Sequence, residues 1–169
     1  FTTKANGDKY DVEIVMNQRH RGANHIGNSV RYELAFVDED WTIQNEMVEW
    51  DGESATITKT LDFEPVAIFC DYDNKFADAC HGYTYIANKT GNKEFKDARI
   101  KLVAKEISDS TLLRVEHRWV GADCNLIDGN KISPNRYWTI HRLDKGESVI
   151  NAEFQYQKND TYDADLLKS

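Results

Sequence analysis

The chain has 169 residues, of which 40% are hydrophobic, and its 4 Trp, 8 Tyr and 7 Phe give it too much apolar surface for a disordered segment. Its formal net charge is −8 and its basic residues form no cluster, which argues against binding to DNA or RNA. The longest apolar runs, such as Val66 to Cys70, are far shorter than the roughly 20 residues that span a bilayer, so no membrane span is expected.

Short runs of alternating apolar and polar residues recur along the whole chain and predict about nine β-strands. The runs lie at 10–16, 30–36, 41–43, 57–63, 66–72, 98–104, 113–119, 138–140 and 152–156. Turn-forming residues separate them, for example Asn6-Gly7, Asp51-Gly52 and Lys145-Gly146. No segment keeps a 3.6-residue period for three turns, so no helix is predicted.

This spacing predicts an all-β fold, an antiparallel immunoglobulin-like β-sandwich that forms a single domain over residues 1–169. The side chains expected between its two sheets are Ile68, Val115, Trp119, Trp138, Ile140 and Phe154. The chain opens on Phe1 with no signal-like segment near it, and we interpret it as a piece cut from a larger protein.

The segment from Leu113 to Trp119 shows the alternation most clearly. A period of two puts Leu113, Val115, His117 and Trp119 on one face, which we expect to point into the core. A histidine on such a face is usually a hydrogen-bonded core residue rather than a ligand or base. The other face, formed by Arg114, Glu116 and Arg118, is expected to lie in water as a cross-strand ladder of charges.

Residues that could carry chemistry do not assemble into a recognisable site. His20 and His25 lie in the polar loop 17–29, where no third metal ligand follows by spacing, so we interpret this loop as solvated. Asp71 to Asn74 begins like a calcium loop but continues with Lys75 and Phe76, so a turn is expected there. No catalytic, cofactor-binding or metal-binding residue is therefore predicted, and no cofactor.

Three cysteines, Cys70, Cys80 and Cys124, cannot all be paired within one chain. Cys70 and Cys80 could form a disulfide across neighbouring strands. The alternative is that all three are small buried thiols.

Three segments, found in the same order, resemble the β-sandwich that follows the catalytic and helical parts of secreted bacterial metallopeptidases of the aminopeptidase N type. The first runs from Leu61 to Asp71 and continues with the Lys75-x-x-Asp78-Ala79 turn. The second contains Val115-Glu116-His117-Arg118-Trp119, with Asp123 after it, and the third contains Ser133-Pro134-Asn135-Arg136-Tyr137-Trp138. Residues before 50 match nothing in that family.

The resemblance implies a zinc peptidase as the parent, in a secreted, periplasmic or cell-surface location. It implies no peptidase in this chain, because the His-Glu-x-x-His motif is absent here and lies in a separate domain of such proteins. The expected function is that of a non-catalytic accessory or structural domain, with the rest of the parent polypeptide as its partner and the fragment itself monomeric. A different reading is a carbohydrate- or protein-binding module that uses exposed aromatic residues such as Trp41 and Trp50. A third, a small jelly-roll enzyme, requires converging histidines or carboxylates that the sequence does not assemble.

Overall fold

The computed structural model describes residues 1–18, 25–76, 79–122, 133–156 and 163. Within these residues every regular element is a β-strand, and every strand pair is antiparallel. The prediction of an all-β antiparallel fold is therefore confirmed, while its immunoglobulin-like subtype stays a prediction. No helix in the described part of the chain is long and apolar enough to cross a membrane.

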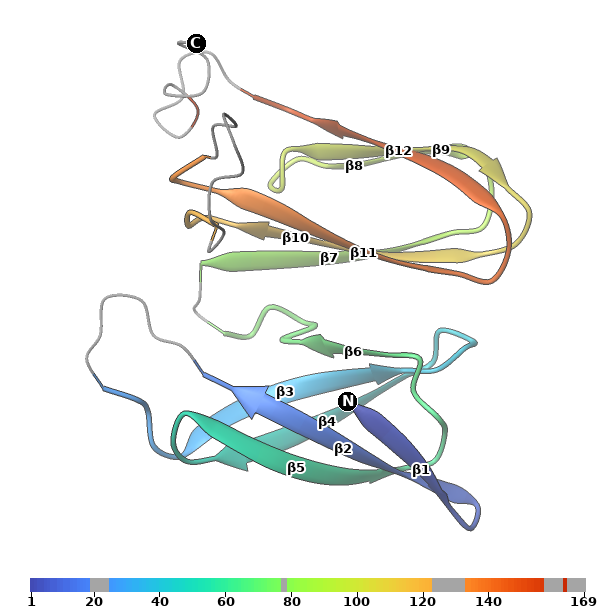
Figure 1. The fold of residues 1–169 in the computed structure, drawn as a ribbon. Coiled ribbons are helices and arrows are strands. Elements are labelled where there is room, and N and C mark those ends of the chain that lie inside the picture. Colours follow the sequence, from blue (N-terminus) through green and yellow to red (C-terminus); the bar gives the residue numbers. More distant parts are fainter. Residues whose placement is uncertain (19–24, 77–78, 123–132, 157–162, 164–169) are drawn as a thin grey trace, which may run out of the picture. The chain divides into compact units, whose positions relative to one another are not determined.

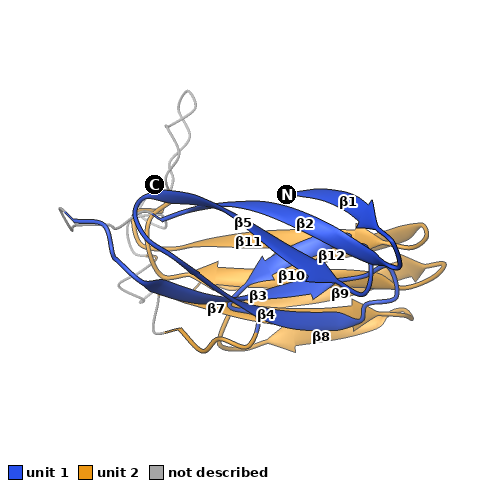
Figure 2. Ribbon diagram, turned by 90° about the horizontal axis from the view of Figure 1, so that it is seen from below, with its two compact units in different colours: residues 1–72 blue, residues 73–169 orange. Residues whose placement is uncertain are grey.

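The chain divides into two compact units, residues 1–72 and residues 73–169, where the sequence analysis expected one domain (Figure 2). Each unit has its own cluster of buried apolar side chains, and no residue belongs to both clusters. Alternation along a strand marks a buried face but not which other strands share it, so the division cannot be read from the pattern.

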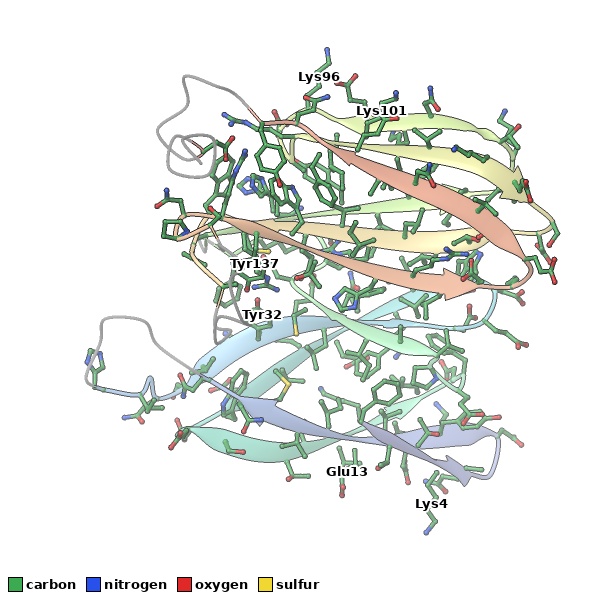
Figure 3. All side chains as sticks on the ribbon, turned by 45° about the horizontal axis from the view of Figure 1, so that its top comes forward. Lys4, Glu13, Tyr32, Lys96, Lys101 and Tyr137 are labelled. Carbon is green, nitrogen blue, oxygen red and sulfur yellow. The ribbon has the colours of Figure 1, made fainter. Side chains whose placement is uncertain are left out.

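Unit 1 is built from six strands: β1 (Thr2–Asn6), β2 (Lys9–Asn17), β3 (Val30–Val37), β4 (Ile43–Trp50), β5 (Ser54–Leu61) and β6 (Ala67–Cys70) (Figure 1). They form two three-stranded sheets with the orders β1-β2-β5 and β4-β3-β6. The core between them contains Val12, Ile14, Leu34, Phe36, Val48, Trp50 and Leu61. Lys4 and Glu13 lie on the outer side of the first sheet, as the period of two requires (Figure 3).

Unit 2 contains β7 (Cys80–Ala87), β8 (Gly91–Phe95), β9 (Ile100–Ile107), β10 (Thr111–Arg118), β11 (Tyr137–Asp144) and β12 (Ser148–Phe154). Its sheets have the orders β8-β9-β12 and β11-β10-β7 (Figure 1). The core between them is formed by Ala87, Phe95, Ala98, Ile100, Leu102, Ala104, Leu113 and Val115. Both units are thus two-layered sandwiches of three strands on three.

The two units share one strand arrangement with a single difference in chain order. In unit 1 the third strand, β3, lies between β4 and the following strand β6. In unit 2 the equivalent strand, β10, lies between β11 and β7, which comes before the other five strands rather than after them. The place filled by the last strand of unit 1 is therefore filled by the first strand of unit 2.

Several expected core residues lie elsewhere. Val115 is fully buried in unit 2 and Trp138 packs against the same cluster, whereas Ile68 packs in unit 1. The prediction was wrong for Ile140 and Phe154, which are 36% and 40% exposed. Both lie on strands at the edge of their sheets, β11 and β12, where one side of the strand has no neighbour to cover it.

The face of β10 that was expected to lie in water is also largely buried. Arg114 is 2% exposed and Glu116 6%, so the expected solvated ladder is wrong for both, and Arg118 is partly buried. Gly82 on the neighbouring strand β7 supplies one reason, because it lacks a side chain and the Arg114 guanidinium lies over it. Arg114 also donates to the Thr84 hydroxyl, and Glu116 pairs with both arginines.

Candidate functional site

Only some of the candidate residues weighed in the sequence analysis belong to the described part of the chain. His20 and Cys124 lie outside the described residues, and His25 is exposed in its loop. Within the described ranges no group of three or more His, Cys, Asp or Glu side chains could hold a metal ion. Asn74, at the start of unit 2, has a left-handed backbone conformation with φ of 53°. Its side-chain amide donates to the Gly82 carbonyl and accepts from the Gly82 N–H.

A cluster at one end of unit 2 joins residues of the second and third sequence motifs. We call it the aromatic–arginine cluster, and its members are Arg99, His117, Trp119, Arg136, Trp138, Tyr156 and Asp163. His117 lies near the end of β10 and Trp119 directly after it, whereas Arg136 precedes β11 and Trp138 lies on it. Because β10 and β11 pair with His117 opposite Trp138, the antiparallel register brings the two motifs side by side.

His117 is enclosed by aromatic rings. It is 0% exposed, and its ring stacks on Trp138 with 4.9 Å between centroids and 5° between planes. The Trp119 ring lies 4.1 Å away at an angle of 50°. The Asp97 backbone lies near the ring and favours its protonated form, but this is not the largest influence on the ring. Burial lowers the pKa of His117 to about 4, helped by the positive charge of Arg136, so the ring is neutral at pH 7.

Arg136 is the charged centre of the cluster, although it is only 1% exposed. Its guanidinium carbon lies 4.8 Å from the Trp138 ring centroid, 5.6 Å from that of Tyr156 and 5.9 Å from that of Trp119. Rings at these distances attract a cation through their negative faces. The guanidinium is thus held by three aromatic side chains.

Asp163 neutralises this buried charge. Arg136 Nε donates to its Oδ1 at 2.9 Å and Arg136 Nη2 to its Oδ2, so the ion pair is bidentate. Asp163 is 0% exposed, and Arg99 Nη1 lies 4.0 Å from the same carboxylate. Charge-assisted bonds of this geometry are among the strongest available to side chains, and they offset the cost of removing both charges from water.

The backbone around the cluster keeps these side chains in place. Ser133 Oγ accepts bonds from the N–H groups of Asn135 and Arg136, both at 3.3 Å. Trp138 Nε1 donates to the Ala98 carbonyl at 2.6 Å, which ties β11 to the turn before β9. Gly121 approaches the Pro134 carbonyl so closely that a Cβ there would lie 2.6 Å from the oxygen. The segments that follow β10 and precede β11 can therefore run close together.

The chemistry open to this cluster is recognition and packing. The His117 ring packs against Trp119 and Trp138, and the positive charge of Arg136 is directed at Asp163. The inward orientation predicted for His117 is confirmed. The Arg136–Asp163 pair was missed, because the two residues are 27 positions apart and Asp163 belongs to no predicted strand.

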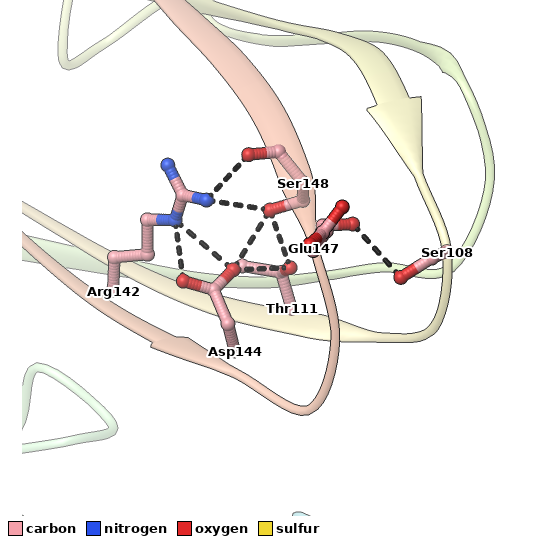
Figure 4. Close-up of polar contacts among 6 residues, drawn as sticks. All are labelled: Ser108, Thr111, Arg142, Asp144, Glu147 and Ser148. Atoms are coloured by element: carbon pink, nitrogen blue, oxygen red, sulfur yellow. Dashed lines mark hydrogen bonds and ion pairs between the residues drawn. The ribbon is translucent and has the colours of Figure 1, made fainter.

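A second polar cluster closes the hairpin between β11 and β12 (Figure 4). Arg142 Nε bonds to both oxygens of Asp144, and its Nη2 donates to the hydroxyl and carbonyl oxygens of Ser148. Thr111 and Ser148 also bond to Asp144 Oδ1, each at 2.7 Å. Although partial burial raises the pKa of Asp144, these bonds outweigh it and hold the pKa below its usual value. The cluster joins the hairpin to the start of β10.

A groove of about 600 Å³ lies in unit 1, at the end where the β1–β2 and β3–β4 turns are. Its walls combine carboxylates with Tyr10 and Phe63; the acidic residues are Asp8, Asp38, Glu39, Asp40, Asp62 and Glu64. Three of these carboxylates are already engaged: Asp62 pairs with Lys9, Glu64 accepts from Thr3, and Asp38 accepts from the backbone of Asp40 and Thr42. They stabilise the turns of unit 1.

The expected aromatic platform does not form. Trp50 is 8% exposed and lies in the core of unit 1, so it cannot pair with Trp41 as an open surface. Trp41 is partly buried in a turn, with φ of 66°.

The two described cysteines, Cys70 and Cys80, lie in different units. Cys70 is exposed on β6 of unit 1, which does not fit the alternative of three buried thiols, and Cys80 is partly buried on β7 of unit 2.

No family model, curated protein or solved structure matches the chain.

Proposed function

We propose that the chain is a non-catalytic accessory region of a larger secreted protein, a zinc metallopeptidase of the aminopeptidase N type, in which it packs against or spaces out the catalytic domain. One observation supports this above the others. The residues that carry the family resemblance, His117, Trp119, Arg136 and Trp138, converge in one cluster where they bury one another. These four side chains pack against one another at one end of the unit 2 sandwich, as structural residues do.

The polar groups of this cluster support the same proposal. The Arg136 charge is directed at Asp163 inside the protein, and His117 is enclosed by indole rings. A catalytic group must reach a substrate, whereas these groups are 0–1% exposed. Sequence motifs that specify buried packing are what an accessory domain needs.

The first test is to read the coding sequence upstream of Phe1. The proposal expects His-Glu-x-x-His there, followed further on by a glutamate, because those are the zinc ligands and general base of such peptidases. An upstream region without a zinc-peptidase motif would contradict the proposed parent.

The second test is biochemical and uses the purified chain. Supplied with zinc, it is expected to release no amine from aminoacyl-anilide substrates above the blank, and the Arg136→Met variant serves as a matched control. Turnover that disappears on chelation would contradict a non-catalytic role. Retention on insoluble polysaccharides, lost in a Trp41→Ala variant, would instead support the alternative of a carbohydrate-binding module.

A further inference from the structure

The aromatic–arginine cluster has the composition of a ligand-binding site. Arg136 offers Nε and Nη2 side by side, the edge of the guanidinium that matches the two oxygens of a carboxylate. Arg99 adds a second positive charge 4.0 Å from the bound carboxylate. Three rings, those of Trp119, Trp138 and Tyr156, surround the Arg136 guanidinium and shield it from water.

The cluster also contains one hydrogen-bond donor that Asp163 does not use. Arg136 Nη1 is buried and has no hydrogen-bond partner. His117 beside it is neutral at pH 7, because burial and the charge of Arg136 lower its pKa to about 4. The charged groups around the carboxylate position are thus the guanidinium groups of Arg136 and Arg99, and a positive charge attracts an anion.

The carboxylate and its receptor come from different parts of the chain. The arginines and rings are carried by the strands of unit 2 and the segments next to them, from Arg99 to Tyr156. Asp163 lies after the last strand, belongs to neither sheet, and is 27 residues from Arg136. The Asp163 carboxylate is therefore supplied by a residue outside the two sheets, as the carboxylate of a separate ligand would be.

We propose that Arg136, Arg99 and the three rings form a carboxylate-binding site whose occupant in this chain is Asp163. The site binds the carboxylate group itself, so it accepts a small free carboxylate once the Asp163 side chain is removed. The proposal does not depend on the parent protein, because every group in it belongs to unit 2.

The test is chemical rescue of Asp163→Ala by formate, which has the size of the carboxylate that the substitution deletes. At pH 7 the variant is expected to melt roughly 10 °C or more below the wild type, because Arg136 is left buried and unpaired. Sodium formate should restore part of the lost melting temperature, and the effect should level off as the formate concentration rises. Sodium chloride at equal ionic strength should not restore it. The wild type and an Arg136→Met/Asp163→Ala double variant should respond equally to the two salts.

Two results would overturn the proposal: an Asp163→Ala variant that melts with the wild type, or equal effects of formate and chloride on that variant. If Asp163→Ala does not fold, refolding in formate replaces the melt. Recovery of its near-ultraviolet circular dichroism in formate and not in chloride supports the site, and no recovery in either contradicts it. Asp163→Asn, whose amide still fills the space, should show no preference for formate.

Discussion

The imidazole of His117 lies flat against the indole of Trp138, with 4.9 Å between centroids and 5° between the ring planes. The two residues face each other across the β10–β11 ladder, so the stack follows from the antiparallel register. Arg136 lies over the same indole at 4.8 Å. A neutral ring and a cation thus share one aromatic partner, and protonation of His117 would place a second cation beside the first.

The stability of unit 2 is therefore expected to fall as the pH falls. The unfolded chain binds a proton at His117 below about pH 6.5, whereas the folded protein resists it until about pH 4. The contribution of neutral His117 is complete above pH 6.5 and is lost progressively down to pH 4, a total of about 3 kcal/mol. Urea unfolding at pH 7 and pH 4 measures this difference.

His117→Phe is the matched variant for this pH test, because it keeps a stacking ring that does not titrate. The groups that act on His117, among them Arg99, Arg136 and His81 opposite it on β7, are the same in both proteins. The loss between pH 7 and pH 4 should be smaller in the variant by about the same 3 kcal/mol. Parallel pH profiles for the two proteins would contradict the assignment to His117.

Arg118→Ala is expected to destabilise unit 2 by about 1–2 kcal/mol, more than an exposed charge would. The reason is its 2.6 Å bond from Nη2 to the Glu116 carboxylate, whose side chain is only 8% exposed. Removal of Arg118 leaves Glu116 paired with Arg114, whose Nε lies at the longer distance of 3.7 Å from the carboxylate. The control is Arg31→Ala on β3, because the Arg31 side chain is 68% exposed and its ion pair with Glu49 should contribute little to stability. Denaturant melts compare the two, and equal small losses would contradict the prediction.

Gly121→Ala is expected to cost about 1–3 kcal/mol, as overpacking does in a close backbone contact. Its Cβ would lie 2.6 Å from the Pro134 carbonyl oxygen, so one of the two segments must move, and Arg136 lies just beyond Pro134. Gly7→Asn is the control, because nothing lies near Gly7 and asparagine tolerates its φ of 61°. Thermal melts should separate the two variants, and an unchanged Gly121→Ala protein would show that the contact can relax.

Leu34→Ala is expected to destabilise unit 1 by about 2–5 kcal/mol, because Leu34 is fully buried in its core. Val15→Ala is the control on the same unit, since Val15 is 60% exposed on β2 and should cost about 0.5 kcal/mol. Hydrogen exchange read from peptides of β2 to β5 reports on unit 1 directly. Equal exchange in the two variants would mean that Leu34 is not a core residue.

Much of the local structure follows from the sequence alone. Period-2 alternation of apolar residues correctly predicts strands around Val12, Leu34, Leu102 and Val115, and it predicts the inward orientation of His117. These features depend on neighbouring residues along one strand, where the alternation of side chains is fixed by backbone geometry.

The tertiary structure decides which strands share a core and which charges are buried. It divides the apolar residues between two units, so that Ile68 and Val115 pack in different cores. It buries Arg114 over Gly82, and it brings Asp163 to Arg136 across 27 residues. Alternation along a strand carries no information on partners distant in the chain, and the burial of a charge depends on those partners.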